Sequence, residues 1–258
     1  MKPRLHLLTI VLDGMPWLTH HIAQFNRLQC DWTWHVIEGA AMPNHDTSWC
    51  KFQAPRLSKD GTTQYLDGLA SHPRVRLYRR PAWDGKREMV NEPLLGISER
   101  CVVMQVDSDE IWDAERIGHI MEIFRGTPDL GVMRFRCNYF VGPNIVSTKD
   151  GTYGNRGDEW TRAWRYEPGM RFLSHEPPNL AGNRGAVMDR HETAALGLYF
   201  NHYAYVTEAQ IAFKQTYYGY RNAVDQWRRL QANSSWPVRL IDYLPWVDAE
   251  AVGDLFVK

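Results

Sequence analysis

One stretch near the middle of the chain, residues 101–112 with the sequence CVVMQVDSDEIW, constrains the fold most. Its first six residues are apolar apart from Gln105 and rich in valine, which predicts a strand buried on both faces. Such strands occur almost only in parallel sheets that helices cover on both sides. We therefore expect an α/β fold in which this strand lies centrally.

The predicted strand ends on carboxylates. Asp107, Asp109 and Glu110 follow it at once. The carboxyl ends of parallel strands open on the crevice in which open α/β proteins bind ligands. Alternate residues of an extended segment point the same way, so Asp107 and Asp109 are placed to converge on one divalent cation. The alternative is a solvated acidic loop, with Asp113 as the N-cap of a helix over residues 114–124.

Strands and helices alternate before this stretch. Strands are expected over residues 5–12, 32–37 and 74–78, and helices with Pro16 in the first turn and over residues 62–69. A further helix with Val90 and Leu94 on one face contains Pro93, so it begins near Asn91 or is kinked. This β-α-β start is typical of a nucleotide-binding layer. Glu38, after the second strand, is placed to bond a base or ribose, or it has a plain turn role.

Several further strands are predicted after residue 130. Strands are expected over residues 131–141, 160–166, 170–173 and 198–206, with a mobile loop over residues 142–159. His202 lies in the strand at 198–206, which is the last one predicted. Thr207 and Gln210 form a capping box that starts a helix containing Lys214, and the tail from Asn222 is expected to be helical and then irregular.

The composition argues against several kinds of partner. The 258 residues include 30 basic and 30 acidic side chains without a polybasic block, which disfavours nucleic acid or electrostatic membrane docking. The first apolar run is short and breaks at Asp13, so we expect a strand and not a signal peptide, and no transmembrane segment is predicted. The cysteines have no metal-type spacing and predict reduced thiols in a cytoplasmic protein; they are Cys30, Cys50, Cys101 and Cys137.

The order of these parts resembles the GT-A glycosyltransferases, specifically the family 2-like group. The matching pieces span roughly residues 5–220 and are TIVLDGMPWL, the strand that ends in Glu38, Gly85-Lys86 with Asn91, VDSDE, RAWRYEPGMRFLSHEPP and HYAYVTEAQIAFK. The Asp-x-Asp piece is common by itself, whereas the ordered set is fairly specific. One departure is the sequence Glu-Gly-Ala-Ala after the second strand, where that group commonly has Asp-x-Ser-x-Asp, so the resemblance does not identify the base recognised.

This resemblance implies a mixed, mostly parallel sheet flanked by helices in one GT-A domain over residues 1–258. Its parts are a nucleotide-binding half (1–112), an acceptor-side half (113–206) and a C-terminal helical tail (207–258). It further implies transfer of a sugar, usually with inversion, from a nucleotide-diphosphate donor such as a UDP-, GDP- or dTDP-sugar. The acceptor would be a carbohydrate or glycan, and Mn²⁺ or Mg²⁺ would bind the diphosphate.

The resemblance also suggests roles for individual residues. The metal ligands would be Asp107, Asp109 and His202, and the donor-binding residues Glu38, Lys86, Asn91, Asp107 and Lys214. Inversion by direct displacement needs a base on the sugar face opposite the diphosphate, and Glu176 is our candidate. Lesser candidates for the base are Asp46, Asp158 and Glu159.

Each of these roles has a simpler alternative. Glu176 is also placed to pair with Arg171 or Arg165, His202 to be a hydrogen-bonded core residue, and Lys214 to be solvated. The 11 Trp and 12 Tyr are numerous, so some are expected to line a cleft or a subunit contact. Sugar rings stack on such side chains, and the tryptophans near the site segments are Trp49, Trp83, Trp112, Trp160 and Trp164.

Two other functions and one association remain open from sequence. A nucleotidyltransferase shares the strand-then-carboxylate layout, but the segment from Asp13 to Trp17 is a poor match for its glycine-rich phosphate loop. A non-catalytic carbohydrate- or protein-binding module would keep the fold and lose turnover. The tryptophan-rich tail is expected to pack on the core or to form a homo-oligomer.

Overall fold

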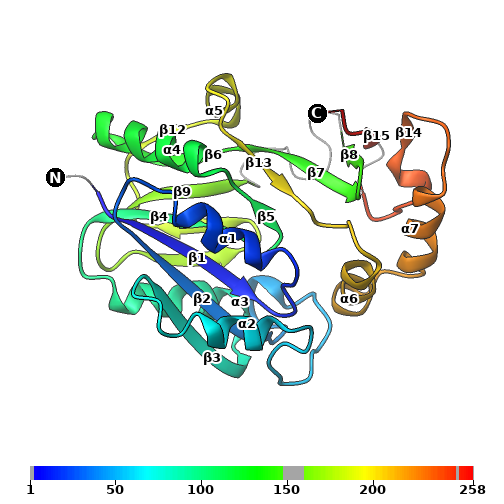
Figure 1. The fold of residues 1–258 in the computed structure, drawn as a ribbon, viewed down its shortest axis with the longest axis horizontal. Helices are drawn as coiled ribbons and strands as arrows, with labels where there is room; N and C mark the ends of the chain where they lie inside the picture. The colour runs from blue at the N-terminus through cyan, green and yellow to red at the C-terminus, as the bar shows by residue number, and fades with distance from the viewer. Residues whose placement is uncertain (1–2, 148–159, 248–249, 258) are drawn as a thin grey trace.

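The computed structural model describes residues 3–147, 160–247 and 250–257 and has a mixed α/β fold (Figure 1). The strands of its main sheet are β1 (Leu5–Val11), β2 (Trp32–Ala41), β3 (Val75–Trp83), β4 (Cys101–Gln105), β6 (Leu130–Arg134), β9 (Thr161–Tyr166) and β12 (Ala186–Met188). They lie in the order β12-β6-β9-β4-β1-β2-β3. Strands β4, β1, β2 and β3 run parallel, and β9 is antiparallel to β4 and β6. The predicted central position of β4 and the mostly parallel sheet are confirmed.

Helices and a hairpin cover the two faces of this sheet. One face packs against α1 (Leu18–Phe25), α2 (Thr62–Gly68) and α4 (Ala114–Gly126). The other packs against α3 (Gly85–Asn91), the 3-10 helix Glu92–Gly96 and the hairpin of β10 (Arg171–His175) and β11 (Pro178–Ala181). Every residue of β2 and β4 is buried, because both faces of a central parallel strand meet apolar side chains.

A second sheet has the strand order β14-β15-β8-β7-β13-β5. Its strands are β5 (Glu110–Ile111), β7 (Arg136–Gly142), β8 (Ile145–Ser147), β13 (Tyr199–His202), β14 (Val238–Arg239) and β15 (Val252–Leu255). The remaining helices are α5 (Arg190–Ala195), the 3-10 helices His45–Thr47 and Leu240–Asp242, α6 (Glu208–Tyr218) and α7 (Ala223–Gln231). In the β5–β13 pair, His202 lies opposite Glu110, so the second sheet brings β13 beside the acidic end of β4.

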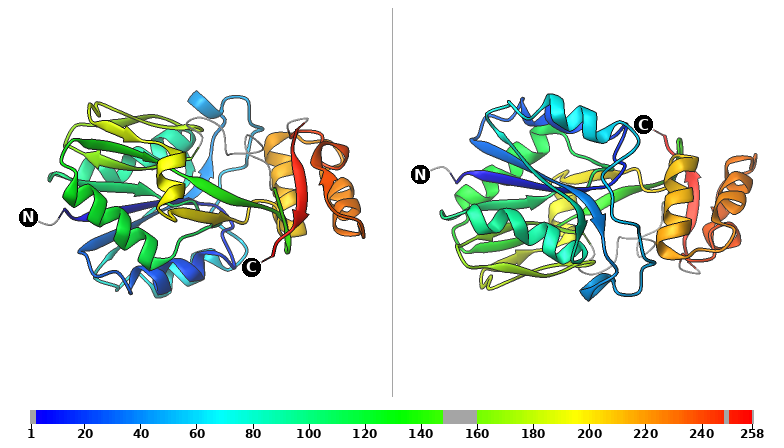
Figure 2. Two further views of the ribbon diagram at one scale, coloured as in Figure 1. Left: turned by 90° about the horizontal axis from the view of Figure 1, so that it is seen from above. Right: turned by 90° about the horizontal axis from the view of Figure 1, so that it is seen from below.

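The C-terminal elements gather at the end of the molecule farthest from the N-terminus (Figures 1 and 2). Helix α6 begins with the predicted capping box, since Thr207 and Gln210 exchange both bonds. The tail packs on the core through Trp227, whose indole N–H donates to the carbonyls of Val141 and Tyr205 at 2.9 and 2.8 Å. A homo-oligomer formed through this tail remains a prediction.

Several predicted elements were wrong in extent. The single strand expected over 131–141 is two strands, because the chain leaves the first sheet at the buried Phe135 and enters the second. Helix α3 begins at Gly85 and ends at Asn91, and Pro93 lies in the following 3-10 helix because proline lacks the N–H that an α-helix needs. The strand containing His202 is not the last, since β14 and β15 follow it. Of the predicted loop, residues 148–159 lie outside the described ranges.

Two buried histidines make the fold sensitive to acid. His21 donates to the carbonyl of Glu110, and the ring of His35 bonds His6 and Tyr78. Burial lowers the pKa of His21 to about 4 and that of His35 to about 3, from 6.5. The unfolded chain therefore binds more protons below pH 6.5, and stability falls as the pH drops from there toward these values.

We expect each histidine to remove about 2 kcal/mol of unfolding free energy between about pH 7 and about pH 5. Urea unfolding of the wild type and of His35→Gln at both pH values measures this loss. Between the two pH values, the unfolding free energy of the variant should fall by about 2 kcal/mol less than that of the wild type, which is the contribution of one histidine. An equal loss in the two proteins would show that His35 does not contribute.

Candidate active site

A cavity of about 690 Å³ opens at the carboxyl ends of β1 and β4, and residues of α3, β10, β13 and α6 also line it. Of the predicted site residues, its lining includes Lys86, Asp107, Asp109, Glu176, His202 and Lys214. They come from segments that are far apart in the sequence, such as those of Lys86 and Lys214. The structure thus gathers these six side chains around one space.

A buried arginine holds the first aspartate of the acidic run. Arg162, on β9 and 2 % exposed, donates to Glu110 Oε1 at 2.7 and 2.9 Å and lies 3.3 Å from Asp107 Oδ2. Burial alone would raise the pKa of Asp107, but Arg162 and His175 outweigh it and hold that pKa well below its usual range. Asp107 is therefore a fixed anion, and Gln105 donates to its other oxygen at 3.1 Å.

Sequence reasoning missed Arg162. The signal available was a basic residue inside the buried strand TRAWRY, because a charge in such a place needs a partner. That partner is Glu110, whose side chain is fully buried. Burial alone would lower the pKa of Arg162, whereas Glu110 and Asp107 raise it, so the guanidinium stays charged.

The second aspartate faces a different group of side chains. Asp109 Oδ1 lies 3.3 Å from Nε2 of His202, and Oδ2 lies 3.9 Å from the ammonium of Lys214. Burial would raise the pKa of Asp109, but His202 and Lys214 lower it to about 2. His202 is fixed by two aromatic rings, with Tyr139 and Trp160 edge-on to it at 4.9 and 5.0 Å.

Asp109 and His202 present a carboxylate oxygen and an imidazole nitrogen to each other, and both atom types are ligands of divalent cations. With its proton on Nε2, His202 donates a hydrogen bond to Asp109 Oδ1; with its proton on Nδ1, Nε2 has a lone pair, and a cation between it and the carboxylate would make the contact favourable. Within the described ranges, no three His, Cys, Asp or Glu side chains are grouped closely enough to hold a metal ion. Asp107 turns toward Arg162, so the remaining ligands of a cation held by Asp109 and His202 would come from a bound molecule or water.

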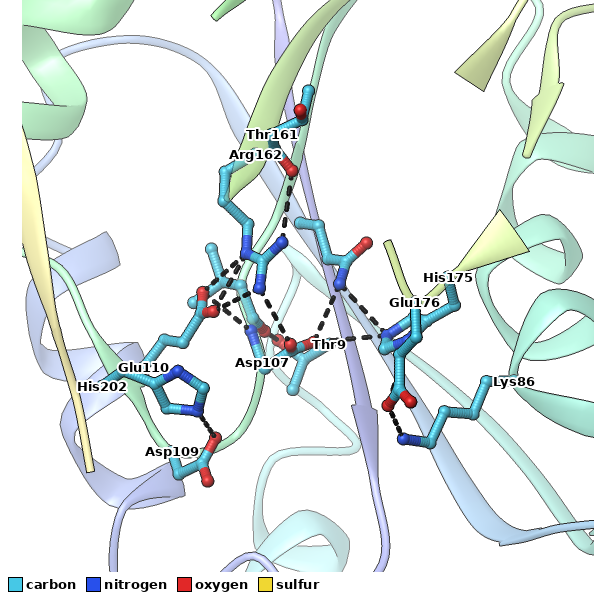
Figure 3. Close-up of polar contacts among 12 residues, drawn as sticks. Thr9, Lys86, Asp107, Asp109, Glu110, Thr161, Arg162, His175, Glu176 and His202 are labelled. Atoms are coloured by element: carbon cyan, nitrogen blue, oxygen red, sulfur yellow. Dashed lines mark hydrogen bonds and ion pairs between the residues drawn. The ribbon is translucent and has the colours of Figure 1, made fainter. Parts of the chain in front are cut away.

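Glu176 lies on the opposite side of the site from Asp109 and His202 (Figure 3). It follows β10 directly and forms an ion pair with the ammonium of Lys86. Burial would raise the pKa of Glu176, but Lys86 outweighs it and lowers that pKa below 4.5. The carboxyl of Asp46 accepts the backbone N–H groups of His175 and Glu176 at 2.6 and 3.2 Å and fixes the chain at this point.

The other candidates occupy different surroundings. The carboxylate of Glu38 is buried beside Arg79 at 2.9 Å, and Asn91 bonds both backbone groups of Phe172 to join α3 to β10. Neither belongs to the described lining of the cavity. Glu176 pairs with Lys86, and not with Arg171 or Arg165 as the alternative from sequence suggested. Asp158 and Glu159 lie outside the described residues.

The five tryptophans named from the sequence divide into two groups. Trp49 and Trp160 line the cavity, whereas the core contains Trp83, Trp112 and Trp164. The four cysteines are thiols in the structure. Across the described residues we find no helix of the length and apolarity that a membrane crossing requires.

Comparisons with known proteins give a fold and no close relative. No family model matches the sequence, and no curated protein matches it significantly. The structure of the mannosyltransferase PcManGT from Pyrobaculum calidifontis in complex with GDP-Man and Mn²⁺ aligns over 95 % of this chain and 68 % of that one, with 12 % identity and a TM-score of 0.52.

Two further structures align over shorter stretches. S. aureus TarS 1–349 in complex with UDP matches 63 % of this chain at 12 % identity and a TM-score of 0.44, and the matched part spans only 46 % of TarS 1–349. CMP:2-keto-3-deoxy-manno-octonic acid synthetase complexed with CTP matches 63 % of this chain and 74 % of that one, at 9 % identity and a TM-score of 0.37. The protein has the GT-A fold of nucleotide-diphospho-sugar transferases.

Proposed function

We propose that the protein is an inverting glycosyltransferase that moves a sugar from a nucleotide-diphosphate donor to an acceptor hydroxyl. The observation that carries the proposal is the cavity at the end of β4, with Asp109 and His202 on one side and Glu176 on the other (Figure 3). Displacement with inversion requires this separation, because the leaving group and the base act on opposite faces of the sugar. The match to PcManGT, which binds GDP-Man and Mn²⁺, is consistent with it.

Asp109 and His202 would hold a divalent cation against the donor diphosphate. Mn²⁺ or Mg²⁺ held by these two residues would supply Lewis-acid stabilisation of the departing nucleoside diphosphate. Lys214 adds a second positive charge, since its ammonium lies 3.9 Å from Asp109. We propose that Asp107, which lines the cavity, contacts the donor. Arg162 would keep the Asp107 carboxylate in place through their ion pair.

Glu176 would take the proton of the acceptor hydroxyl as that oxygen attacks the anomeric carbon. A base must be ionised to accept a proton, and Lys86 keeps Glu176 in this form by lowering its pKa. The same ammonium limits the strength of the base, so we expect the Lys86–Glu176 pair to loosen when donor and acceptor occupy the cavity.

A nucleotidyltransferase fits the first loop less well. Such an enzyme uses backbone N–H groups of this loop to hold a triphosphate. Here the N–H groups of Asp13, Gly14 and Met15 are already bonded at 2.8 to 3.0 Å, and their acceptors are side-chain oxygens of Ser58, Thr62 and Asp60. These donors are therefore occupied within the chain itself.

Turnover tests the proposal directly. The purified protein is incubated with UDP-, GDP-, CDP- and dTDP-linked sugars, Mn²⁺ and a mixture of glycoside acceptors, and release of nucleoside diphosphate is followed. We expect the protein to turn over sugars linked to one of these nucleotides. Binding of a sugar nucleotide without turnover would indicate the non-catalytic module, and release of pyrophosphate from a nucleoside triphosphate would indicate the nucleotidyltransferase.

The Lys86–Glu176 pair predicts a pH effect. Lys86→Met removes the charge that lowers the pKa of Glu176 and leaves burial, which raises it. The acid limb of the pH profile of kcat/KM should therefore move to higher pH in this variant, because Glu176 becomes protonated earlier. The exposed Lys59→Met is the matched control and should keep the wild-type midpoint. Coincident midpoints for wild type and Lys86→Met would remove Glu176 from the acid limb.

A further inference from the structure

An exposed aromatic pair lies beside the proposed base. The rings of Trp49 and Tyr218 are stacked, with centroids 5.2 Å apart and planes 13° from parallel. Both line the cavity, and Trp49 is 53 % exposed although one face of its ring lies on Tyr218. The hydroxyl of Tyr218 is 3.5 Å from Glu176 Oε1. An aromatic platform is thus open to a ligand next to the carboxylate that would remove a proton.

One short turn fixes this platform relative to the base. The carbonyl of Asp46 accepts the indole N–H of Trp49 at 3.1 Å, while the carboxyl of Asp46 accepts the backbone N–H groups of His175 and Glu176. The backbone N–H of Lys51 donates a hydrogen bond of 2.7 Å to the carbonyl of Tyr217, which joins the same segment to α6. The indole and the base are therefore positioned by the same residue, and a ligand on the platform meets Glu176 in a defined geometry.

The spacing along α6 separates the platform from the diphosphate side. Lys214 and Tyr218 are four residues apart on α6, so they lie on one face, about 6 Å apart along the axis. Lys214 faces Asp109, where the donor diphosphate would bind, and Tyr218 faces Glu176. A nucleobase lies beyond the diphosphate from the transferred sugar, so a ligand beside Glu176 is on the acceptor side.

We infer that Trp49 and Tyr218 form the acceptor subsite and take the apolar C–H face of a pyranose ring, so that the acceptor is itself a sugar. This inference rests on the proposed function, since the subsite is defined by Glu176 as base. A flat, rigid aromatic face with a polar group at its edge suits a ring that has an apolar face and peripheral hydroxyls. Asp46 is then a positioning residue, which holds both the platform and the base.

Direct binding tests the inference without relying on turnover. Saturation-transfer NMR is recorded with the methyl pyranosides of glucose, galactose, mannose and N-acetylglucosamine, and with glycerol and sorbitol as ring-free controls, with and without nucleoside diphosphate and Mn²⁺. The proteins are wild type, Trp49→Ala, Trp49→Phe and Phe52→Ala. Phe52 is the matched control, because it is 66 % exposed, three residues from Trp49 and outside the described lining of the cavity.

We expect magnetisation from the protein to reach the ring C–H protons of at least one pyranoside. Neither ring-free polyol should receive it. Trp49→Ala should weaken that binding by about tenfold or more, with Trp49→Phe between it and wild type and Phe52→Ala unchanged. Nucleotide binding should be equal in all four proteins. Loss of nucleotide binding in Trp49→Ala would assign the platform to the nucleobase and overturn the inference.

Two further results would also overturn it. They are equal pyranoside binding by wild type and Trp49→Ala, and failure of every pyranoside in the panel to bind the wild type. Failure of the proposed function appears separately, as absence of nucleotide binding and turnover in the wild type, whatever the pyranosides do.

Discussion

Glu176→Gln should lower the rate of sugar transfer by about two or more powers of ten and leave donor binding intact. The amide is nearly the same size as the carboxylate but cannot accept the proton of the acceptor hydroxyl. Glu176 lies across the site from Asp109 and His202, so its loss should not disturb the diphosphate side. Transfer rates under saturating donor, together with calorimetric donor affinity, separate the two effects.

The control for this variant is Glu167→Gln, in the exposed turn before β10, where Glu167 pairs with Arg100 at the surface. It should transfer sugar at the wild-type rate. Unchanged transfer by Glu176→Gln would remove Glu176 as base and would leave Asp46 as the described alternative. Weakened donor binding in Glu176→Gln would instead place Glu176 among the donor contacts.

Arg162→Met should destabilise the protein by about 3–5 kcal/mol, because it leaves the buried carboxylate of Glu110 without its counter-charge. Asp107 loses the same partner and its fixed position, so donor binding should weaken as well. Urea unfolding gives the stability change. The control is Arg125→Met, which breaks an exposed ion pair with Glu122 and should cost under about 1 kcal/mol.

A second variant keeps this prediction testable if Arg162→Met does not fold. Arg162→Met combined with Glu110→Gln removes both charges, so it should recover part of the lost stability relative to the single variant. A single variant within about 1 kcal/mol of wild type, or a double variant less stable than the single, would show that the pair does not hold the end of β4 in place.

The sequence predicted the central strand and the carboxylates after it because that signal is local. A run of buried residue types that stops on carboxylates indicates where a buried strand ends and a polar site begins. Strand β4 and the carboxylates after it lie at the predicted place, but Asp107 turns toward Arg162 and Asp109 toward His202. The resemblance to GT-A proteins added Glu176, His202 and Lys214, which are distant in sequence and share the cavity in the structure.

The features that the sequence did not predict depend on long-range packing. The split at Phe135 occurs because two sheets compete for one alternating segment, which periodicity alone cannot divide. Arg162 was missed because its role arises from meeting Glu110 and Asp107 across strands. The placements of Glu38 beside Arg79 and of Asn91 against Phe172 likewise depend on contacts that no local pattern contains.

The most direct test of the proposed function is calorimetric titration with UDP, GDP, CDP and dTDP, with and without Mn²⁺, of wild type and Asp109→Asn. The account predicts that one nucleotide binds the wild type in a Mn²⁺-dependent way, and that Asp109→Asn loses the dependence because His202 alone cannot hold the cation. Absence of nucleotide binding under every condition, or equal Mn²⁺-dependent binding by Asp109→Asn, would contradict it.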